Sequence, residues 1–114
     1  MSKIRDILLS STTPVPTLPT LKLHADTWKD HILVRHPEMA GKEDLVQKIM
    51  SEPKVVGITQ QNAENYVLFD PQITSPSGNS VLTVFASPKD QVVVTAFYSR
   101  GFSTSDVETI IWQA

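Results

Sequence analysis

Four β-rich runs follow one another in the second half of the chain, and this feature constrains the fold more than any other. They cover residues 54–59, 65–70, 80–86 and 91–98, and polar or Pro-containing turns separate them. The last run is apolar on both faces except at Thr95, which is typical of a strand that is covered on both sides. Consecutive strands that follow consecutive helices predict an antiparallel sheet, here a four-stranded meander with the last run at its centre.

Two helical patterns precede these strands, and a third follows them. The first covers residues 28–36 and should end there, because Pro37 disfavours helical geometry in the residue before it. The second covers residues 42–52, has apolar residues spaced for one buried face, and is closed by Pro53. A Ser-x-x-Glu capping box at 105–108 predicts a short C-terminal helix. We therefore expect an α+β domain with two N-terminal helices, the four-stranded antiparallel meander sheet and a short C-terminal helix.

The first twenty residues differ in composition from the rest of the chain. Three prolines lie within six residues, at positions 14, 16 and 19. Proline lacks a backbone donor and biases its neighbours towards extended conformations. We therefore expect residues 1–20 to be an N-terminal arm with a Pro-rich linker, which a protein partner or cognate inhibitor can bind. Residues 21–114 should form a single domain.

The charge balance and the lack of cysteine exclude several classes of protein. The 114 residues include 10 Lys and Arg against 12 Asp and Glu, and the net charge is -2. This balance argues against non-specific nucleic-acid binding, which depends on many cationic contacts to phosphates. Because the chain has no Cys, thiolate nucleophiles, disulfides and thiolate metal sites are excluded. The apolar stretch near the start is too short for a signal peptide or a membrane helix, so we expect a cytoplasmic protein without membrane contact.

The helix expected at 28–36 carries the residues best suited to chemistry. At about 100° per residue, His31 and Arg35 lie one turn apart beside Trp28, and His36 lies on the opposite flank at the last turn. Arg offers a permanent charge with forked donors, and His exchanges a proton near neutral pH, so the two can act together on a phosphate. An ordinary polar surface helix has the same spacing, so both interpretations stay open.

The histidines do not have the spacing of a metal site. His24, His31 and His36 are seven and five residues apart, so no two share a helical face at the i, i+4 spacing of zinc proteases. Glu38 lies near His36 in sequence, but no further residue completes a tetrahedral set. We therefore expect no metal and no cofactor.

The last strand adds three further candidates. Thr95 lies among Val and Phe, and its hydroxyl either bonds to the backbone or faces the first helix from the sheet. Tyr98 and Arg100 lie at the end of the strand. Arg100 can contact a phosphate there, although an exposed terminal Arg has the same sequence signature.

Three segments together resemble a known nuclease family. They are the string from His31 to Glu38, the second helix ending at Pro53, and the strand at 92–96. They are similar to the phage-associated branch of the barnase–EndoU–colicin–RelE-like (BECR-fold) nucleases, over roughly residues 24–101. The resemblance implies a metal-independent endoribonuclease, often a toxin that acts on cellular RNA. Toxin nucleases of this group are commonly basic, and this chain is acidic.

The resemblance also implies a role for each candidate residue. In this chemistry the 2′-hydroxyl of RNA attacks the adjacent phosphate, so the site needs a base, an acid and a cation. His31 would exchange the proton, Arg35 would stabilise the charge on the phosphate, and His36 would be the second proton carrier. Thr95 would be the fourth catalytic residue and orient the phosphate from the sheet, and Tyr98 and Arg100 would bind the substrate.

Two other functions fit the same residues. One is a non-catalytic regulatory or protein-binding module of the same fold, in which the Pro-rich arm and the first helix bind a partner. The other is an intracellular enzyme that acts on a small phosphorylated metabolite in a deeper pocket. A nuclease should gather His31, Arg35 and Thr95 in one open cleft, whereas a binding module should present an apolar patch.

Overall fold

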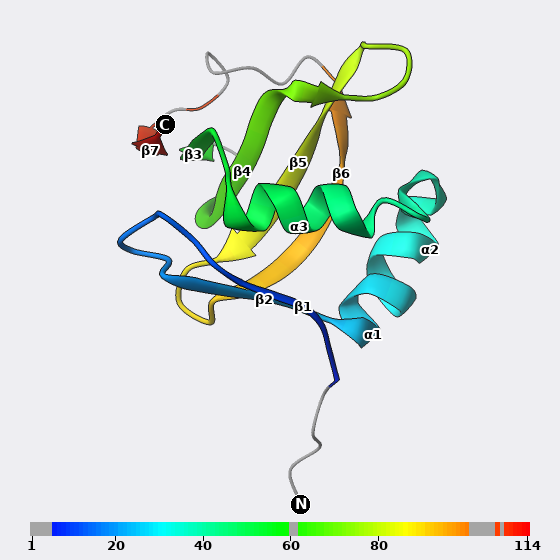
Figure 1. Cartoon of the computed structure of the whole chain (residues 1–114), viewed down its shortest axis with the longest axis horizontal. Helices are drawn as coiled ribbons and strands as arrows, with labels where there is room; N and C mark the ends of the chain where they lie inside the picture. The colour runs from blue at the N-terminus through cyan, green and yellow to red at the C-terminus, as the bar shows by residue number, and fades with distance from the viewer. Residues whose placement is uncertain (1–5, 60–61, 101–106, 108) are drawn as a thin grey trace, which may run out of the picture.

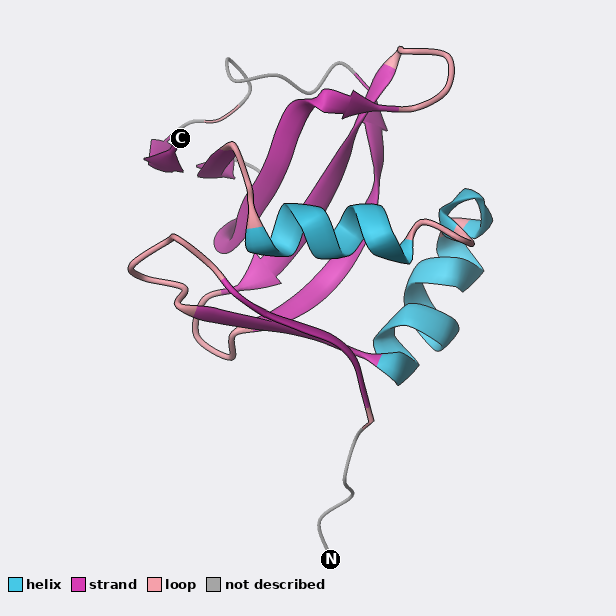
Figure 2. Ribbon diagram, viewed as in Figure 1, coloured by secondary structure: helices cyan, strands magenta, loops and turns pink. Residues whose placement is uncertain are grey.

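A seven-stranded mixed sheet, in the order β1-β2-β6-β5-β4-β3-β7, runs through the protein (Figure 1). It is described by a computed structural model that covers residues 6–59, 62–100, 107 and 109–114, apart from the side chains of residues 62, 63 and 100. One helix lies across the sheet and another lies at its side (Figure 2). The strands are β1 (Ile7–Thr12), β2 (Thr20–His24), β3 (Val55–Thr59), β4 (Asn62–Thr74), β5 (Ser80–Ser87), β6 (Val92–Arg100) and β7 (Thr109–Gln113). The helical segments are α1 (Ala25–Thr27), η1 (Trp28–Ile32), α2 (Leu33–Arg35), η2 (Pro37–Met39) and α3 (Glu43–Ser51).

The predicted fold is wrong as a whole, although its four strands are present. β3, β4, β5 and β6 pair antiparallel in chain order. Three further strands extend this group on both sides. β1 and β2 form a hairpin that joins β6 in parallel through Lys22 and Val92, and β7 pairs antiparallel with β3. The sheet is therefore mixed, and its middle strand is β5 and not β6.

The Pro-rich segment is the loop of the β1–β2 hairpin. Val15 and Leu18 in this loop are fully buried in the main core. The Thr13 hydroxyl donates a hydrogen bond to the carbonyl of Leu18 and accepts one from the amide of Val15 at 3.1 Å. The segment is therefore a packed part of the domain and not the free arm predicted from its prolines, because the apolar residues between the prolines enter the core.

The first helix spans residues 25–35 and contains a π-helical turn. The amide of Leu33 donates to the carbonyl of Trp28, five residues earlier, whereas a regular helix joins residues four apart. The wider turn changes the direction of the residues that follow it. Trp28 and Ile32 are buried, but Arg35 is exposed. The regular helical spacing that predicts Arg35 beside Trp28 therefore does not describe this helix. The helix ends before Pro37, as predicted.

The second helix, α3, packs across one face of the sheet, which we call the first face (Figure 1). The predicted helix at 42–52 agrees with it. Its residues Val46, Ile49 and Met50 are fully buried and share the main core with Leu68 and Val84 of the sheet. This core closes the first face to solvent and fixes the position of the strands.

On the opposite face, the second face, the described residues form a closed core on the side of β3 and β4. Val55, Val67 and Phe69 form a small core there with Val107. Gly57 makes this closure possible, because a Cβ at that position would clash with Val107 and would lie 2.7 Å from the carbonyl oxygen of Thr109. Among the side chains of β5 and β6 on this face, Thr83 is fully buried, whereas Phe85, Thr95 and Phe97 are half-buried.

The described C-terminal residues form a strand. The helix predicted from the capping box is wrong for Thr109–Gln113, which is β7, whereas residues 105, 106 and 108 of the capping box lie outside the described residues. The free edge of β3 offers unpaired backbone groups to the C-terminal segment, and this pairing overrides a local helix signal. Among the described residues, no helix combines the length and apolar character needed to cross a membrane.

Candidate functional site at the end of the first helix

His36 lies where the first helix ends and the chain turns towards the second face. Its backbone is non-helical, at φ -135 and ψ 72. Its imidazole stacks on the ring of Phe97 in β6, with the ring centroids 4.5 Å apart and the planes 18° apart. Its Nδ1 atom lies 3.6 Å from Oε1 of Glu38, an ion pair when the imidazole is protonated. The side chain of His36 is 28% exposed, so the ring is held by two partners and still open to solvent.

The stacking continues from β6 to β5. Phe97 stacks on Phe85 with the centroids 5.3 Å apart and the planes 18° apart. We call the three stacked rings of His36, Phe97 and Phe85 the aromatic row. Each stacked pair contributes about 0.5–1.5 kcal/mol beyond the burial of its area. The aromatic row therefore ties the end of the helix to two neighbouring strands.

Thr95 shares the second face with the aromatic row. It pairs with Phe85 across the strands, and one residue separates it from Phe97. Residues two apart on a strand point to the same face and lie about 6.5–7 Å apart along it. The structure thus brings two of the four expected catalytic residues, His36 and Thr95, to one side of the sheet.

The other two expected catalytic residues lie on the helix itself. His31 is half-buried in the π-helical turn, and Arg35 is exposed directly before His36. Within the described part of the chain, no hydrogen bond or ion pair connects His31 with Arg35, or either of them with Thr95. The structure therefore does not gather these three side chains through direct contacts.

The two expected substrate-binding residues are placed differently. Tyr98 follows Phe97 in β6 and points to the first face, where its ring packs against the main core. Arg100 is the last residue of β6, and its side chain lies outside the described part of the structure. Tyr98 is therefore separated from His36 and Thr95 by the thickness of the sheet.

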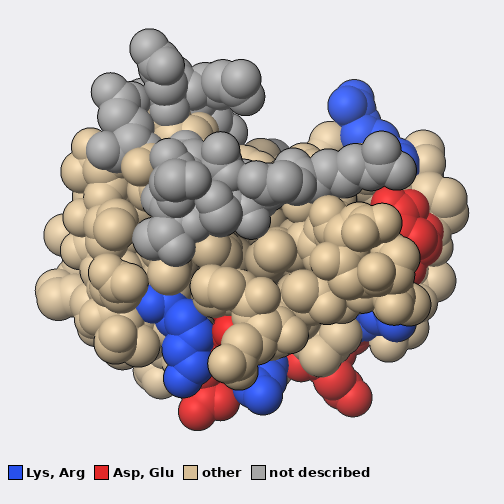
Figure 3. All heavy atoms as spheres, turned by 90° about the horizontal axis from the view of Figure 1, so that it is seen from above, with Lys and Arg blue, Asp and Glu red and all other residues tan. Residues whose placement is uncertain are grey.

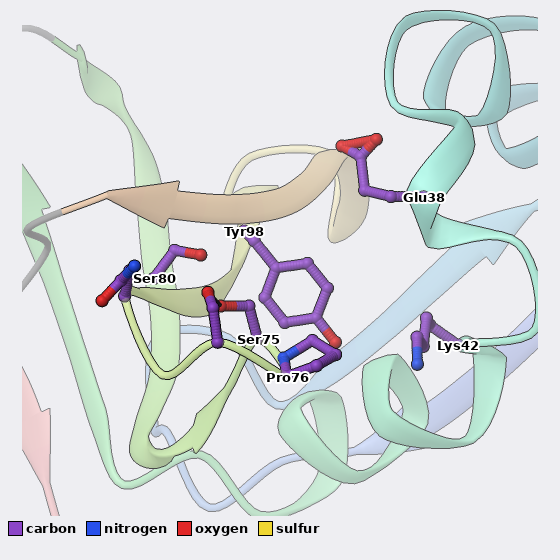
Figure 4. Close-up of a pocket in the computed structure, with 8 residues that line it drawn as sticks. Glu38, Lys42, Ser75, Pro76, Ser80 and Tyr98 are labelled. Atoms are coloured by element: carbon purple, nitrogen blue, oxygen red, sulfur yellow. Dashed lines mark hydrogen bonds between the residues drawn. The ribbon is translucent and has the colours of Figure 1, made fainter.

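Tyr98 lines a pocket of about 460 Å³ on this other side of β6 (Figure 4). The pocket lies between the turn that joins β4 to β5 and the segment that joins η2 to α3. The residues that line it are mainly polar, namely Glu38, Lys42, Ser75, Pro76, Ser77, Asn79, Ser80 and Tyr98. Its volume lies within the range of about 300–1,000 Å³ that is usual for small-molecule sites.

Burial raises the pKa of the Tyr98 phenol above its ordinary value of 10.0. Removal from water disfavours the charged phenolate, so the hydroxyl keeps its proton at neutral pH. In Figure 4 the hydroxyl points towards Pro76 and the side of the pocket where Lys42 lies. Tyr98 can therefore donate a hydrogen bond to a ligand in this pocket.

Charges of both signs lie on the surface seen in Figure 3. Lys and Arg alternate with Asp and Glu along one border of the surface in Figure 3, and no broad basic surface appears on that side. Within the residues described, no group of three or more His, Asp or Glu side chains is placed to hold a metal ion.

Sequence reasoning missed three residues of these sites. Glu38 was weighed only as a metal ligand, but its position two residues after His36 places it beside the imidazole. Phe97 carries no signal of its own, since any β-rich run contains such a residue. Lys42 precedes the second helix and looks like an ordinary surface lysine, and only the turn at 75–79 makes it part of a pocket.

Comparison with known protein families, with curated proteins and with solved structures finds no match to this chain. The resemblance to BECR-fold nucleases thus depends on the sequence motifs alone.

Proposed function

We propose that this chain is a ribonuclease that cleaves RNA without a metal ion, with its active site on the second face around His36. The observation that carries the proposal is the placement of the His36 imidazole, which is half-open to solvent between the Glu38 carboxylate and the ring of Phe97. A proton-transferring imidazole needs a fixed orientation and access to its substrate, and this placement provides both.

His36 takes the proton from the 2′-hydroxyl in the proposed reaction. The oxygen then forms a bond to the adjacent phosphorus, the bond from phosphorus to the 5′-oxygen breaks, and that oxygen receives a proton. The products carry a 2′,3′-cyclic phosphate and a 5′-hydroxyl. Glu38 balances the positive charge that His36 gains. We assign the proton for the 5′-oxygen to His31, the half-buried histidine in the π-helical turn of the helix that ends before His36.

Thr95 and Arg35 provide contacts to the phosphate in this proposal. The Thr95 hydroxyl lies on the same face as His36, and the exposed guanidinium of Arg35 lies one residue before it in the chain. Forked donors and a permanent charge suit the developing charge on a phosphate. The aromatic row offers ring faces on which an unpaired base can stack. The π-helical turn adds support, because such turns are frequent at functional sites.

The proposal is tested by incubating purified protein with a mixed RNA pool in the presence of EDTA and mapping the ends produced. We expect 2′,3′-cyclic phosphate and 5′-hydroxyl ends. His36→Ala should lower the cleavage rate by about 10²–10⁴-fold, the usual contribution of a positioned acid or base. His24→Ala is the matched control, because His24 is another half-buried histidine at the start of the same helix.

Three outcomes would overturn the proposal. They are the absence of cleavage by the wild-type protein, cleavage that leaves 5′-phosphate ends, and equal cleavage by the wild type and His36→Ala. Circular dichroism of each variant shows that a loss of cleavage is not a loss of fold.

A non-catalytic binding module is the second candidate, and the exposed apolar residues favour it. Ile7 and Leu8 of the edge strand β1 are 50% and 37% exposed, and Val34 on the first helix is 71% exposed. An edge strand can pair with another protein through its unpaired backbone groups. A wild-type protein that is folded but does not cleave RNA would favour this candidate.

A further inference from the structure

We propose that the pocket between η2, α3 and the β4–β5 turn binds one nucleotide, with its phosphate near Lys42 and Tyr98 and its sugar or base near Glu38. That this nucleotide is part of the cleaved RNA, next to the reacting phosphate, rests on the proposed function. The pocket is built from three separate segments of the chain, namely residues 38–42, 75–80 and Tyr98.

One side of the pocket suits a phosphate. Lys42 supplies an ammonium group with three donors, and Lys is a common phosphate-binding residue. The Tyr98 hydroxyl points towards the same side (Figure 4). A charged donor and a neutral donor in one pocket can together bind an anion in a chain whose net charge is -2.

The other side of the pocket suits a group that donates hydrogen bonds. The Glu38 carboxylate lies apart from Lys42 in Figure 4. When it is ionised, it accepts hydrogen bonds and donates none. It would repel a second phosphate, but it can accept a hydrogen bond from a ribose hydroxyl or from the amino group of a base. The two ends together favour a ligand that has a phosphate at one end and a donor at the other, as a nucleotide has.

The β4–β5 turn closes the pocket with short polar side chains. The amide of Ser75 donates to the carbonyl of Ser80 at 2.9 Å, and the hydroxyls of Ser75 and Ser77 lie 3.1 Å apart. Gly78 has φ 77, a conformation that favours glycine, so the turn keeps this shape at low cost. Pro76 adds an apolar surface beside the phenol of Tyr98 (Figure 4).

Glu38 connects the pocket with the proposed active site. The same carboxylate lines the pocket and lies 3.6 Å from Nδ1 of His36. A nucleotide in the pocket would therefore contact the same carboxylate that lies beside the imidazole. An RNA chain that passes the end of the first helix would reach both.

The experiment measures binding without cleavage. Isothermal titration calorimetry with a nucleoside 5′-monophosphate, the parent nucleoside and inorganic phosphate separates the contributions of the two ends. We expect the nucleotide to bind more tightly than either part. Lys42→Gln and Tyr98→Phe should each weaken nucleotide binding, by about tenfold or more for the loss of the charged contact. Lys48→Gln is the matched control, because Lys48 is exposed on α3, the helix that begins directly after Lys42, and does not line the pocket.

The binding result is independent of the cleavage result. Nucleotide binding that Lys42→Gln weakens and Lys48→Gln does not would support the pocket, even if the wild-type protein left RNA intact and the proposed function failed. The absence of nucleotide binding, or equal binding by the wild type, Lys42→Gln and Tyr98→Phe, would overturn the inference even if RNA were cleaved. Equal binding of inorganic phosphate and nucleotide would overturn the role given to Glu38.

Discussion

The two faces of the sheet are built from the same strands and differ in what covers them. The first face lies under α3, and its residues Leu68, Leu82 and Val84 are fully buried. On the second face, Val107 packs with Val55, Val67 and Phe69 on the side of β3 and β4. The side of β5 and β6 carries the aromatic row and Thr95, all half-buried. One face therefore supplies most of the stability, and the other keeps rings and a hydroxyl accessible.

This difference separates stability from chemistry. Substitutions of core residues under α3 should lower the free energy of unfolding and leave the cleavage rate of the folded protein unchanged. Substitutions on the open side of the second face should lower the cleavage rate, with a smaller loss of stability. The following predictions test this contrast, from the largest expected change in stability to the smallest.

Leu68→Ala should destabilise the protein most, by about 2–5 kcal/mol, because it leaves a cavity in the main core. Urea denaturation measures the loss. Val94→Ala is the control, because Val94 is 38% exposed on β6 and its truncation should change stability by about 0.5 kcal/mol or less. A smaller effect for Leu68→Ala than for Val94→Ala would contradict the description of the first face.

Gly57→Ala tests the closed side of the second face. The added methyl group would clash with Val107 and with the carbonyl of Thr109, so the C-terminal segment has to move. Overpacking of this kind typically costs about 1–3 kcal/mol. Thermal unfolding should show this loss, whereas cleavage at a temperature where the variant is folded should persist. An unchanged melting temperature would show that Val107 does not pack over Gly57.

Phe97→Leu tests the aromatic row. The variant keeps an apolar side chain but loses two ring pairs, each worth about 0.5–1.5 kcal/mol. Because the His36 ring loses its support, we expect kcat for RNA cleavage to fall as well. Phe85→Leu is the matched control, since it removes one ring pair that does not involve His36. Equal kcat values for the two variants would exclude a positioning role for Phe97.

Tyr98→Phe should have the smallest effect on stability, and only at alkaline pH. Burial raises the pKa of the folded-state phenol above 10.0, so the unfolded chain loses this proton first as the pH rises. The folded state then binds more protons than the unfolded state, and stability falls as the pH rises from about 10 through the folded-state pKa. Tyr98→Phe should show a shallower alkaline loss in urea midpoints measured between pH 8 and about 11. An identical alkaline slope for the two proteins would contradict this reasoning.

The sequence predicts those parts of the fold that have a strong local pattern. The four strands β3 to β6 and the helix α3 follow from alternation and from helical spacing. β1 was missed because its sequence ends in polar residues and leads into prolines, and only pairing with β2 makes it a strand. β7 was read as a helix because a capping box is a local signal, whereas the edge of β3 is not visible in the sequence. The π-helical turn has no recognisable local signal.

The site was predictable residue by residue but not as an arrangement. Thr95 stands out as a polar residue in an apolar strand, and His36 as an imidazole at the predicted end of the helix. The structure places both on the second face. The link between them is Phe97, an apolar residue in an apolar strand. The separation of Tyr98 from these residues follows from strand alternation. The pocket around Lys42 depends on a turn that lies more than thirty residues away in the chain.

Mapping of RNA contacts by NMR tests the central claim most directly. The probe is a single-stranded RNA oligonucleotide with 2′-O-methyl groups, which cannot attack the phosphate, titrated into isotope-labelled protein. The account predicts that the largest chemical-shift changes occur at His36, Thr95 and Phe97 on the second face. Changes confined to the edge strand β1, or no changes at all, would contradict it.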